Sequence, residues 1–181
     1  MYVGEILRAD SANGLGMRVS LFVSGCTNRC KNCFNQKTWD FHYGKPWTPE
    51  LEQFLMDELS KDWYDGLTIL GGEPFEPSNQ EGLLPLIRRV RRELPKRNIW
   101  MYTGNLYEDL LPGGRRYTPF TDEILDSIDV LVDGPYVEEL HNVTLNYRGS
   151  ENQRIIDMKQ TRAEGQVVLS PLNEFTSRYR T

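Results

Sequence analysis

The chain has 181 residues, of which 39% are hydrophobic and 26% are charged, and its formal net charge is −5. This length favours a single domain with a buried core, and the composition argues against disorder. The acidic balance argues against nucleic acid as a partner, because phosphate binding needs a dense basic surface. No apolar run approaches the roughly 20 residues that span a bilayer, and residues 1–8 do not resemble a signal peptide. We therefore expect a cytoplasmic protein without a membrane partner.

Four segments have the composition of strands. Residues 17–24 alternate toward β-branched and apolar side chains, which favours a strand. Residues 66–70, 98–103 and 129–132 are short apolar runs, and each is followed by glycine or by Asp-Gly-Pro. Such runs are typical of buried strands in a parallel sheet.

Helices are expected between these strands. Thr48 can cap the first helix, with Pro49 at its first helical position. The second covers about 84–94, and we place its start near Pro85 because proline is tolerated best in a first turn. Thr121 is the expected cap of a third, short helix. Alternation of strand and helix predicts an α/β fold with a parallel sheet.

The unusual loops all follow predicted strands, where α/β proteins place their chemistry. They contain the cysteines, Gly71-Gly-Glu-Pro74, Tyr102-Thr-Gly104 and Asp133-Gly-Pro135. A full eight-stranded barrel needs about 250 residues, so this chain can form only a partial, open βα barrel of mostly parallel strands.

The domain organisation follows from this pattern. We expect one domain over residues 1–181, with its core at about 13–157. The tail, 158–181, is polar and stays unassigned, although residues 166–169 could form a last strand.

Three cysteines fall within eight residues: Cys26, Cys30 and Cys33. An odd number in one loop makes a poor disulfide framework and indicates a metal. Structural zinc normally takes four protein ligands, and neither His42 nor His141 has an obvious ligand spacing. Ferredoxin-type clusters use a fourth cysteine, so this spacing suggests a 4Fe–4S cluster with one iron free of protein ligands. Three unrelated thiols, or a zinc site completed by His42, remain alternatives.

The cysteine loop after a first strand, with Gly71-Gly-Glu-Pro74 after the second, resembles the radical S-adenosylmethionine superfamily. Further stretches resemble, more narrowly, the activating proteins of anaerobic (class III) ribonucleotide reductase: residues 14–26, 33–35 with 38–39, 129–136 and 147–154. The likeness covers roughly residues 13–157 and implies a radical-SAM type of partial barrel.

This resemblance implies a reductive cleavage of S-adenosylmethionine, whose amino and carboxylate groups would chelate the open iron. The resulting 5′-deoxyadenosyl radical would take a hydrogen from a glycine of the anaerobic ribonucleoside-triphosphate reductase. The implied partners are the catalytic subunit of that reductase and a low-potential electron donor such as flavodoxin or ferredoxin. Because the target glycine lies in another protein, we expect the mouth around the cluster to be an open docking surface.

The resemblance also implies roles for matched residues. Cys26, Cys30 and Cys33 would hold the cluster. The carbonyls of Gly71 and Gly72, together with the carboxylate of Glu73, would accept hydrogen bonds from the methionine ammonium.

Other matched residues would contact the rest of the cofactor. Asn32 stands where the superfamily often has an aromatic residue, so Phe34 is the expected substitute near the adenine. Asp133 would contact the ammonium or the ribose, although an aspartate before Gly-Pro is also a good turn former. Two residues at the end of the third strand should line the same mouth: Tyr102 and Thr103.

Two further functions stay open: an activase of another glycyl-radical protein or a small-molecule radical enzyme, and a non-catalytic metal-binding interaction module. The small size and the lack of further cysteines speak against additional clusters. A basic run on the second helix is either a solvated face or a docking site for an acidic electron carrier: Arg88, Arg89, Arg91 and Arg92.

Overall fold

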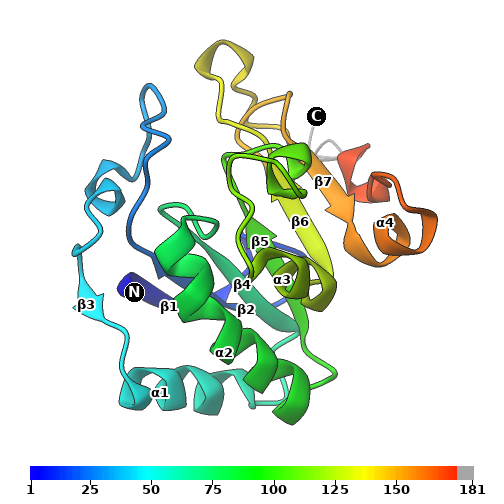
Figure 1. Ribbon diagram of the computed structural model, residues 1–181. Coiled ribbons are helices and arrows are strands. Elements are labelled where there is room, and N and C mark those ends of the chain that lie inside the picture. Colours follow the sequence, from blue (N-terminus) through cyan, green and yellow to red (C-terminus); the bar gives the residue numbers. More distant parts are fainter. Residues whose placement is uncertain (175–181) are drawn as a thin grey trace, which may run out of the picture.

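The computed structural model describes residues 1–174, and the last part of the unassigned tail, 175–181, lies outside the described residues (Figure 1). The described residues form a seven-stranded sheet in the order β3-β1-β2-β4-β5-β6-β7. Its strands are β1 (Tyr2–Asp10), β2 (Arg18–Val23), β3 (Lys45–Pro46), β4 (Gly66–Gly71), β5 (Asn98–Tyr102), β6 (Val130–Asp133) and β7 (Arg154–Asp157). Neighbours among β2, β4, β5 and β6 are parallel, and β1, β3 and β7 pair antiparallel. The protein is therefore mixed α/β, and the four predicted strands form its parallel centre.

Three helices lie against one face of this sheet: α1 (Pro49–Leu59), α2 (Pro77–Glu93) and α3 (Thr121–Ser127) (Figure 1). The helix α4 (Met158–Glu164) follows β7 in the predicted tail. The remaining turns are 3₁₀ helices: η1 (Gln36–Trp39), η2 (Tyr107–Leu110), η3 (Glu138–Leu140) and η4 (Pro171–Asn173). No helix within residues 1–174 is long and apolar enough to cross a membrane.

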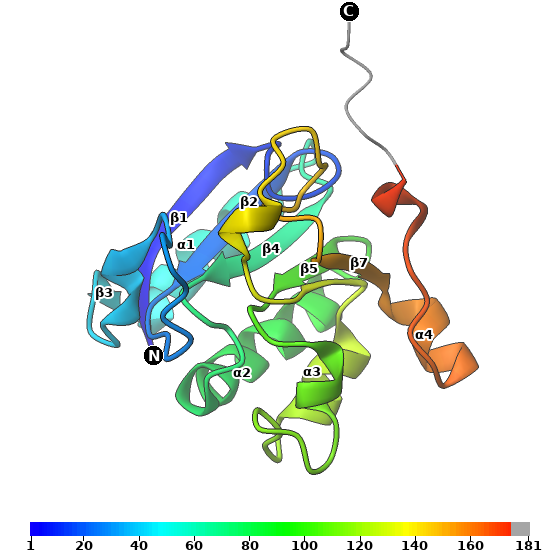
Figure 2. The ribbon, with the colours of Figure 1, turned by 90° about the horizontal axis from the view of Figure 1, so that it is seen from above.

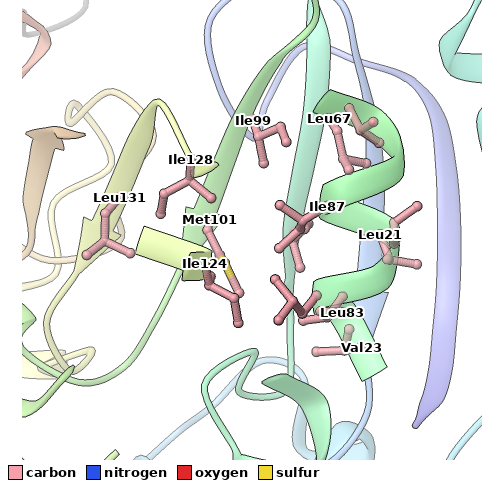
Figure 3. Close-up of a cluster of buried hydrophobic side chains, with 14 of the residues drawn as sticks. Leu21, Val23, Leu67, Leu83, Ile87, Ile99, Met101, Ile124, Ile128 and Leu131 are labelled. Carbon is pink, nitrogen blue, oxygen red and sulfur yellow. The ribbon is translucent and has the colours of Figure 1, made fainter. Parts of the chain in front are cut away.

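The hydrophobic core fills the space between these helices and the sheet. Leu83 and Ile87 project from α2 toward the strands, where Leu21 and Leu67 meet them (Figure 3). All four side chains are fully buried. Burying such side chains contributes about 1.5–3 kcal/mol each, which makes this layer the main source of stability.

The opposite face of the sheet buries a cation. Arg18 is fully buried and donates hydrogen bonds to the hydroxyl of Thr68 (2.5 Å) and to the carbonyls of Leu67 (2.8 Å) and Leu15 (2.9 Å). Its guanidinium lies 5.3 Å from the centre of the Trp100 ring. Burial lowers the pKa of Arg18 to about 10. These contacts hold the loop that joins β1 to β2.

Two helix starts differ from the predictions. Helix α2 begins at Pro77, eight residues before Pro85, which lies inside it. Pro85 is exposed, so the carbonyl that its missing N–H leaves unpaired can face water. Thr121 is the first residue of α3 rather than its cap, and its hydroxyl donates to Gln80 (2.6 Å). Thr48 does cap α1, accepting from the amide of Leu51 at 3.3 Å, as predicted.

Three strands were not predicted. The long strand β1 precedes β2, the short strand β3 pairs with β1 at one edge of the sheet, and β7 occupies 154–157 at the other edge. The expected last strand at 166–169 was wrong, because this stretch forms only one bridge, between Leu169 and Ile156 of β7. All three missed strands pair antiparallel, so the alternation of strands and helices does not require them.

Candidate metal centre

The three cysteines lie in a loop, residues 25–38, that begins just beyond the carboxyl end of β2. Figure 1 shows this loop and the segment 134–153 rising from the same end of the sheet, and Figure 2 looks down on that end. The loop is closed by two backbone hydrogen bonds, from Gly25 to the carbonyl of Thr38 (2.7 Å) and from Cys26 to Trp39 (3.4 Å). A further turn brings the amide of Cys33 to the carbonyl of Cys30 at 3.2 Å.

All three thiols are free and half-buried. Burial raises the pKa of Cys26 to about 11 and also raises the pKa of Cys30. These two thiols therefore stay protonated at neutral pH until a metal displaces the protons. Free thiols on one loop are the donors that an iron–sulfur cluster requires.

The arrangement does not favour a single metal ion. Among residues 1–174, no three or more His, Cys, Asp or Glu side chains are gathered as ligands of one ion. His42, the proposed fourth zinc ligand, is exposed, and its Nδ1 lies 3.8 Å from Asp40.

The turn after β4 packs directly on the start of the cysteine loop. The amide of Gly72 donates to the carbonyl of Val23 (2.7 Å), and that of Glu73 donates to Gly25 (2.9 Å). A Cβ atom on Gly71, which has a φ of +113°, would lie 2.6 Å from the carbonyl oxygen of Val23. One on Gly72 would lie 2.6 Å from the carbonyl oxygen of Gly25. Both glycines are therefore required by backbone packing.

Glu73 is fully buried, and its two carboxylate oxygens accept five hydrogen bonds. The donors, at 2.8–2.9 Å, are Asn28 Nδ2, the amides of Phe75 and Gly104, the hydroxyl of Thr103 and Asn105 Nδ2. Burial raises the pKa of Glu73, but every partner donates, which suits the ionised carboxylate. The side chain links the cysteine loop to the end of β5, and its oxygens are already occupied. Thr103, which we expected to line the mouth, is buried, and its hydroxyl donates to Glu73.

Asp133 is also fully buried and already paired. Its oxygens accept from Arg154 at 2.9 and 2.5 Å and from the amide of Tyr107 at 2.7 Å. The hydrogen bond to Asp133 raises the pKa of Arg154, which also pairs with Glu108 at 2.9 Å. The expected contact of Asp133 with an ammonium or ribose stays a prediction, and it would require this fully buried side chain to become accessible. Asp133 instead fixes the end of β6 to β7.

A cavity of about 510 Å³ opens between the cysteine loop and the segment 134–153. Its lining includes two cysteines and three other predicted residues: Cys30, Cys33, Asn32, Phe34 and Tyr102. The segment 134–153 adds Tyr147 and Arg148.

Two polar atoms of this lining are buried without a partner. The hydroxyl of Tyr102 and the Nε of Arg148 have no hydrogen-bond partner among residues 1–174. Burial raises the pKa of Tyr102, so its hydroxyl is a neutral donor. Orphaned buried donors are costly, which indicates a ligand with acceptor atoms.

Comparison with known proteins shows the family to which the chain belongs. A family model described as a 4Fe-4S single cluster domain matches residues 12–156. The anaerobic ribonucleoside-triphosphate reductase-activating protein of Haemophilus influenzae is 42% identical over 148 residues, which cover 81% of this chain and 91% of the relative. Proteins of the same name from Enterobacteria phage T4 and Escherichia coli K12 are 37% and 36% identical, over 86% and 80% of this chain and 93% and 90% of theirs. The chain belongs to this family of activating proteins. Its metal centre is therefore a 4Fe–4S site.

Several residues at the site were not predicted from the sequence. Glu76 and Arg116 form an ion pair of 2.7 Å whose side chains are 4% and 11% exposed. Asn105 donates to Glu73. The position of Glu76, three residues after Glu73, is a weak indication that it belongs to the site. Arg116 lies in a loop containing Gly and Arg, and nothing in that sequence indicates a role at the site.

The basic run of α2 is neutralised in place. Each of its arginines pairs with a carboxylate: Arg88 with Glu123 (2.5 Å), Arg89 with Glu52 (3.0 Å), Arg91 with Asp129 (2.5 Å) and Arg92 with Glu93 (2.8 Å). Charges that are already paired offer little attraction to an acidic carrier. The interpretation as a docking site for an electron carrier therefore has no support from the structure.

Proposed function

We propose that this chain is a glycyl-radical activase that uses S-adenosylmethionine to activate an anaerobic ribonucleoside-triphosphate reductase. The observation that carries the proposal is the 510 Å³ cavity bordered by Cys30 and Cys33 and lined by residues with two orphaned donors. Cys26, Cys30 and Cys33 would hold the cluster, which would supply the electron for the reductive cleavage of the sulfonium C–S bond of S-adenosylmethionine.

The cavity has groups suited to each part of S-adenosylmethionine. Tyr102 and Arg148 can donate hydrogen bonds to acceptors such as the carboxylate or the ribose oxygens. Tyr147 and Phe34 can pack against the adenine, with Asn32 beside them. The backbone of Gly71 and Gly72 remains our proposed partner of the ammonium.

The rim of this cavity suits a protein partner. Phe34 is 93% exposed, and Val143 and Leu140, on the segment 134–153, are 84% and 39% exposed. Exposed apolar side chains around a reactive site typically mark an interaction surface. We propose that the glycine-bearing segment of the reductase docks here, and that the electron comes from a flavodoxin- or ferredoxin-like donor.

Two wider features belong to the same proposal. The sheet would be the open, partial βα barrel of the radical-SAM type, formed by one domain over the chain. A cytoplasmic location is expected because the free cysteines need a reducing compartment.

The test is the cleavage reaction itself. The chain is reconstituted anaerobically with iron and sulfide, reduced with dithionite and given S-adenosylmethionine, and 5′-deoxyadenosine is measured by chromatography. We expect product from the wild-type chain and none from Cys30→Ala. Cleavage by Cys30→Ala would contradict the proposal. A reconstituted wild-type cluster that gives no 5′-deoxyadenosine would favour the non-catalytic module instead.

A further inference from the structure

Arg116 reaches the cysteine loop from a distant part of the chain. It lies between η2 and α3, and its Nη2 donates to the hydroxyl of Thr27 (2.8 Å) and to Oδ1 of Asn28 (2.9 Å). Its Nη1 donates to Oε2 of Glu76 at 2.7 Å, and its Nε to Asn105 at 3.3 Å. One nearly buried guanidinium therefore bridges the cysteine loop, the start of α2 and the end of β5.

Glu76 completes this bridge from the other side. Its Oε1 accepts from both the amide (2.7 Å) and the hydroxyl (2.6 Å) of Thr27, while its Oε2 takes the ion pair with Arg116. Glu76 directly precedes α2, which begins at Pro77 and packs into the core. The amide and the hydroxyl of Thr27 thus both bind Glu76, at the start of the packed helix α2.

The location of these bonds in the chain is what matters for the cluster. Thr27 and Asn28 lie between Cys26 and Cys30, the wider of the two gaps between the cysteines. Asn28 is held at both ends of its amide, donating to Glu73 and accepting from Arg116. By contrast, the gap between Cys30 and Cys33 has a backbone turn of 3.2 Å and two exposed ion pairs of 3.6 Å, from Lys31 to Glu138 and Glu139.

We propose that Arg116 and Glu76 are positioning residues for the cluster, clamping residues 27–28 so that Cys26 and Cys30 keep a fixed separation. The inference rests on the 4Fe–4S site and not on the identity of the protein that is activated. Second-layer partners of this kind orient ligands in metal sites generally, and their removal commonly weakens metal binding by 10–100-fold. A cluster in an unclamped loop would be lost faster and would occupy more than one environment.

The test compares variants of the full chain after anaerobic reconstitution. Thr27→Val removes one hydroxyl from the clamp at an exposed position and should leave folding intact, and Thr27→Ser restores that hydroxyl. Arg116→Gln with Glu76→Gln removes both charges together, which avoids a buried unpaired ion. The matched control is Arg115→Gln, because Arg115 is its exposed neighbour and lies 3.6 Å from Asp109, away from the clamp.

The readouts are the rate of iron release to a chelator, the electron paramagnetic resonance line shape of the reduced cluster, and circular dichroism for folding. Thr27→Val and the double variant should lose iron about ten-fold faster, a factor that corresponds to about 1.4 kcal/mol, and broaden the spectrum. Thr27→Ser and Arg115→Gln should match the wild type. A folded Thr27→Val protein with wild-type iron release and line shape would overturn the proposal, even if the double variant failed to fold. If a variant lost cleavage activity with unchanged iron release and line shape, the clamp would be contradicted. The proposal that the wild-type chain is an activase would not be affected.

Discussion

Replacing Gly72 by alanine distinguishes two reasons why this position is glycine: close packing of the backbone, or access for S-adenosylmethionine. The new Cβ would lie 2.6 Å from the carbonyl oxygen of Gly25 and 3.0 Å from that of Thr38, and both atoms belong to the closed backbone of the cysteine loop. Neither can rotate away as a side chain could, so the loop must shift. Such overpacking costs about 1–3 kcal/mol. For a chain of this size that lowers the melting temperature by roughly 2–12 °C.

The assay is thermal unfolding of the protein without metal or S-adenosylmethionine, followed by the iron content after reconstitution. We expect Gly72→Ala to melt earlier and to bind less iron. Gly4→Ala is the control, since Gly4 lies in β1 and its Cβ would come no nearer than 3.2 Å, to the side chain of Tyr43. If Gly72→Ala melted like the wild type and only its affinity for S-adenosylmethionine fell, the steric argument would be refuted, and the glycine would serve the ligand alone.

Three further predictions concern charges and the exposed rim. Asp133→Asn should destabilise the protein by about 3 kcal/mol in urea unfolding, because it leaves Arg154 without its buried partner; an unchanged midpoint would contradict this. Arg154 lowers the pKa of Glu108 below its ordinary 4.5, so the stabilisation from Glu108 is present above that pH and is lost as the pH falls through the lower, folded value. As the pH is lowered below 4.5, the urea midpoint of the wild type should therefore fall more steeply than that of Glu108→Gln. Identical pH profiles of the two proteins would count against the ion pair. Phe34→Ala should leave the unfolding free energy within about 0.5 kcal/mol of wild type, because the ring is 93% exposed, but should weaken pull-down of the reductase; equal binding would remove Phe34 from the docking surface.

The parallel centre of the fold could be predicted because its strands are short, apolar and bounded by glycine or Asp-Gly-Pro. The edges could not, since nothing in the local pattern of residues 2–10 says that they pair antiparallel with β2. Pro85 misled the prediction of α2 for a similar reason. Its local cost is small on the exposed side of a helix whose other side is held in the core by Leu83 and Ile87.

The predictions for the site show the same difference between local and long-range contacts. The cysteines were identified by their spacing, and the two glycines by a resemblance of the short motif that contains them, because both signals lie in neighbouring residues of the chain. The partners of Glu73 and Asp133 come from other strands and loops, so the sequence could not show that both carboxylates are already paired. Their predicted contacts with S-adenosylmethionine stay predictions. Arg116 lies 89 positions from Thr27, which it holds through tertiary structure alone.

Whether this chain installs a radical in a partner reductase can be measured by electron paramagnetic resonance. The reconstituted chain is combined with S-adenosylmethionine, a strong reductant and the anaerobic reductase subunit of the same organism. We expect a glycyl-radical doublet that disappears when any component is omitted or when Cys30 is replaced by alanine. An intact cluster that forms 5′-deoxyadenosine but produces no doublet would contradict the claim that this reductase is its substrate.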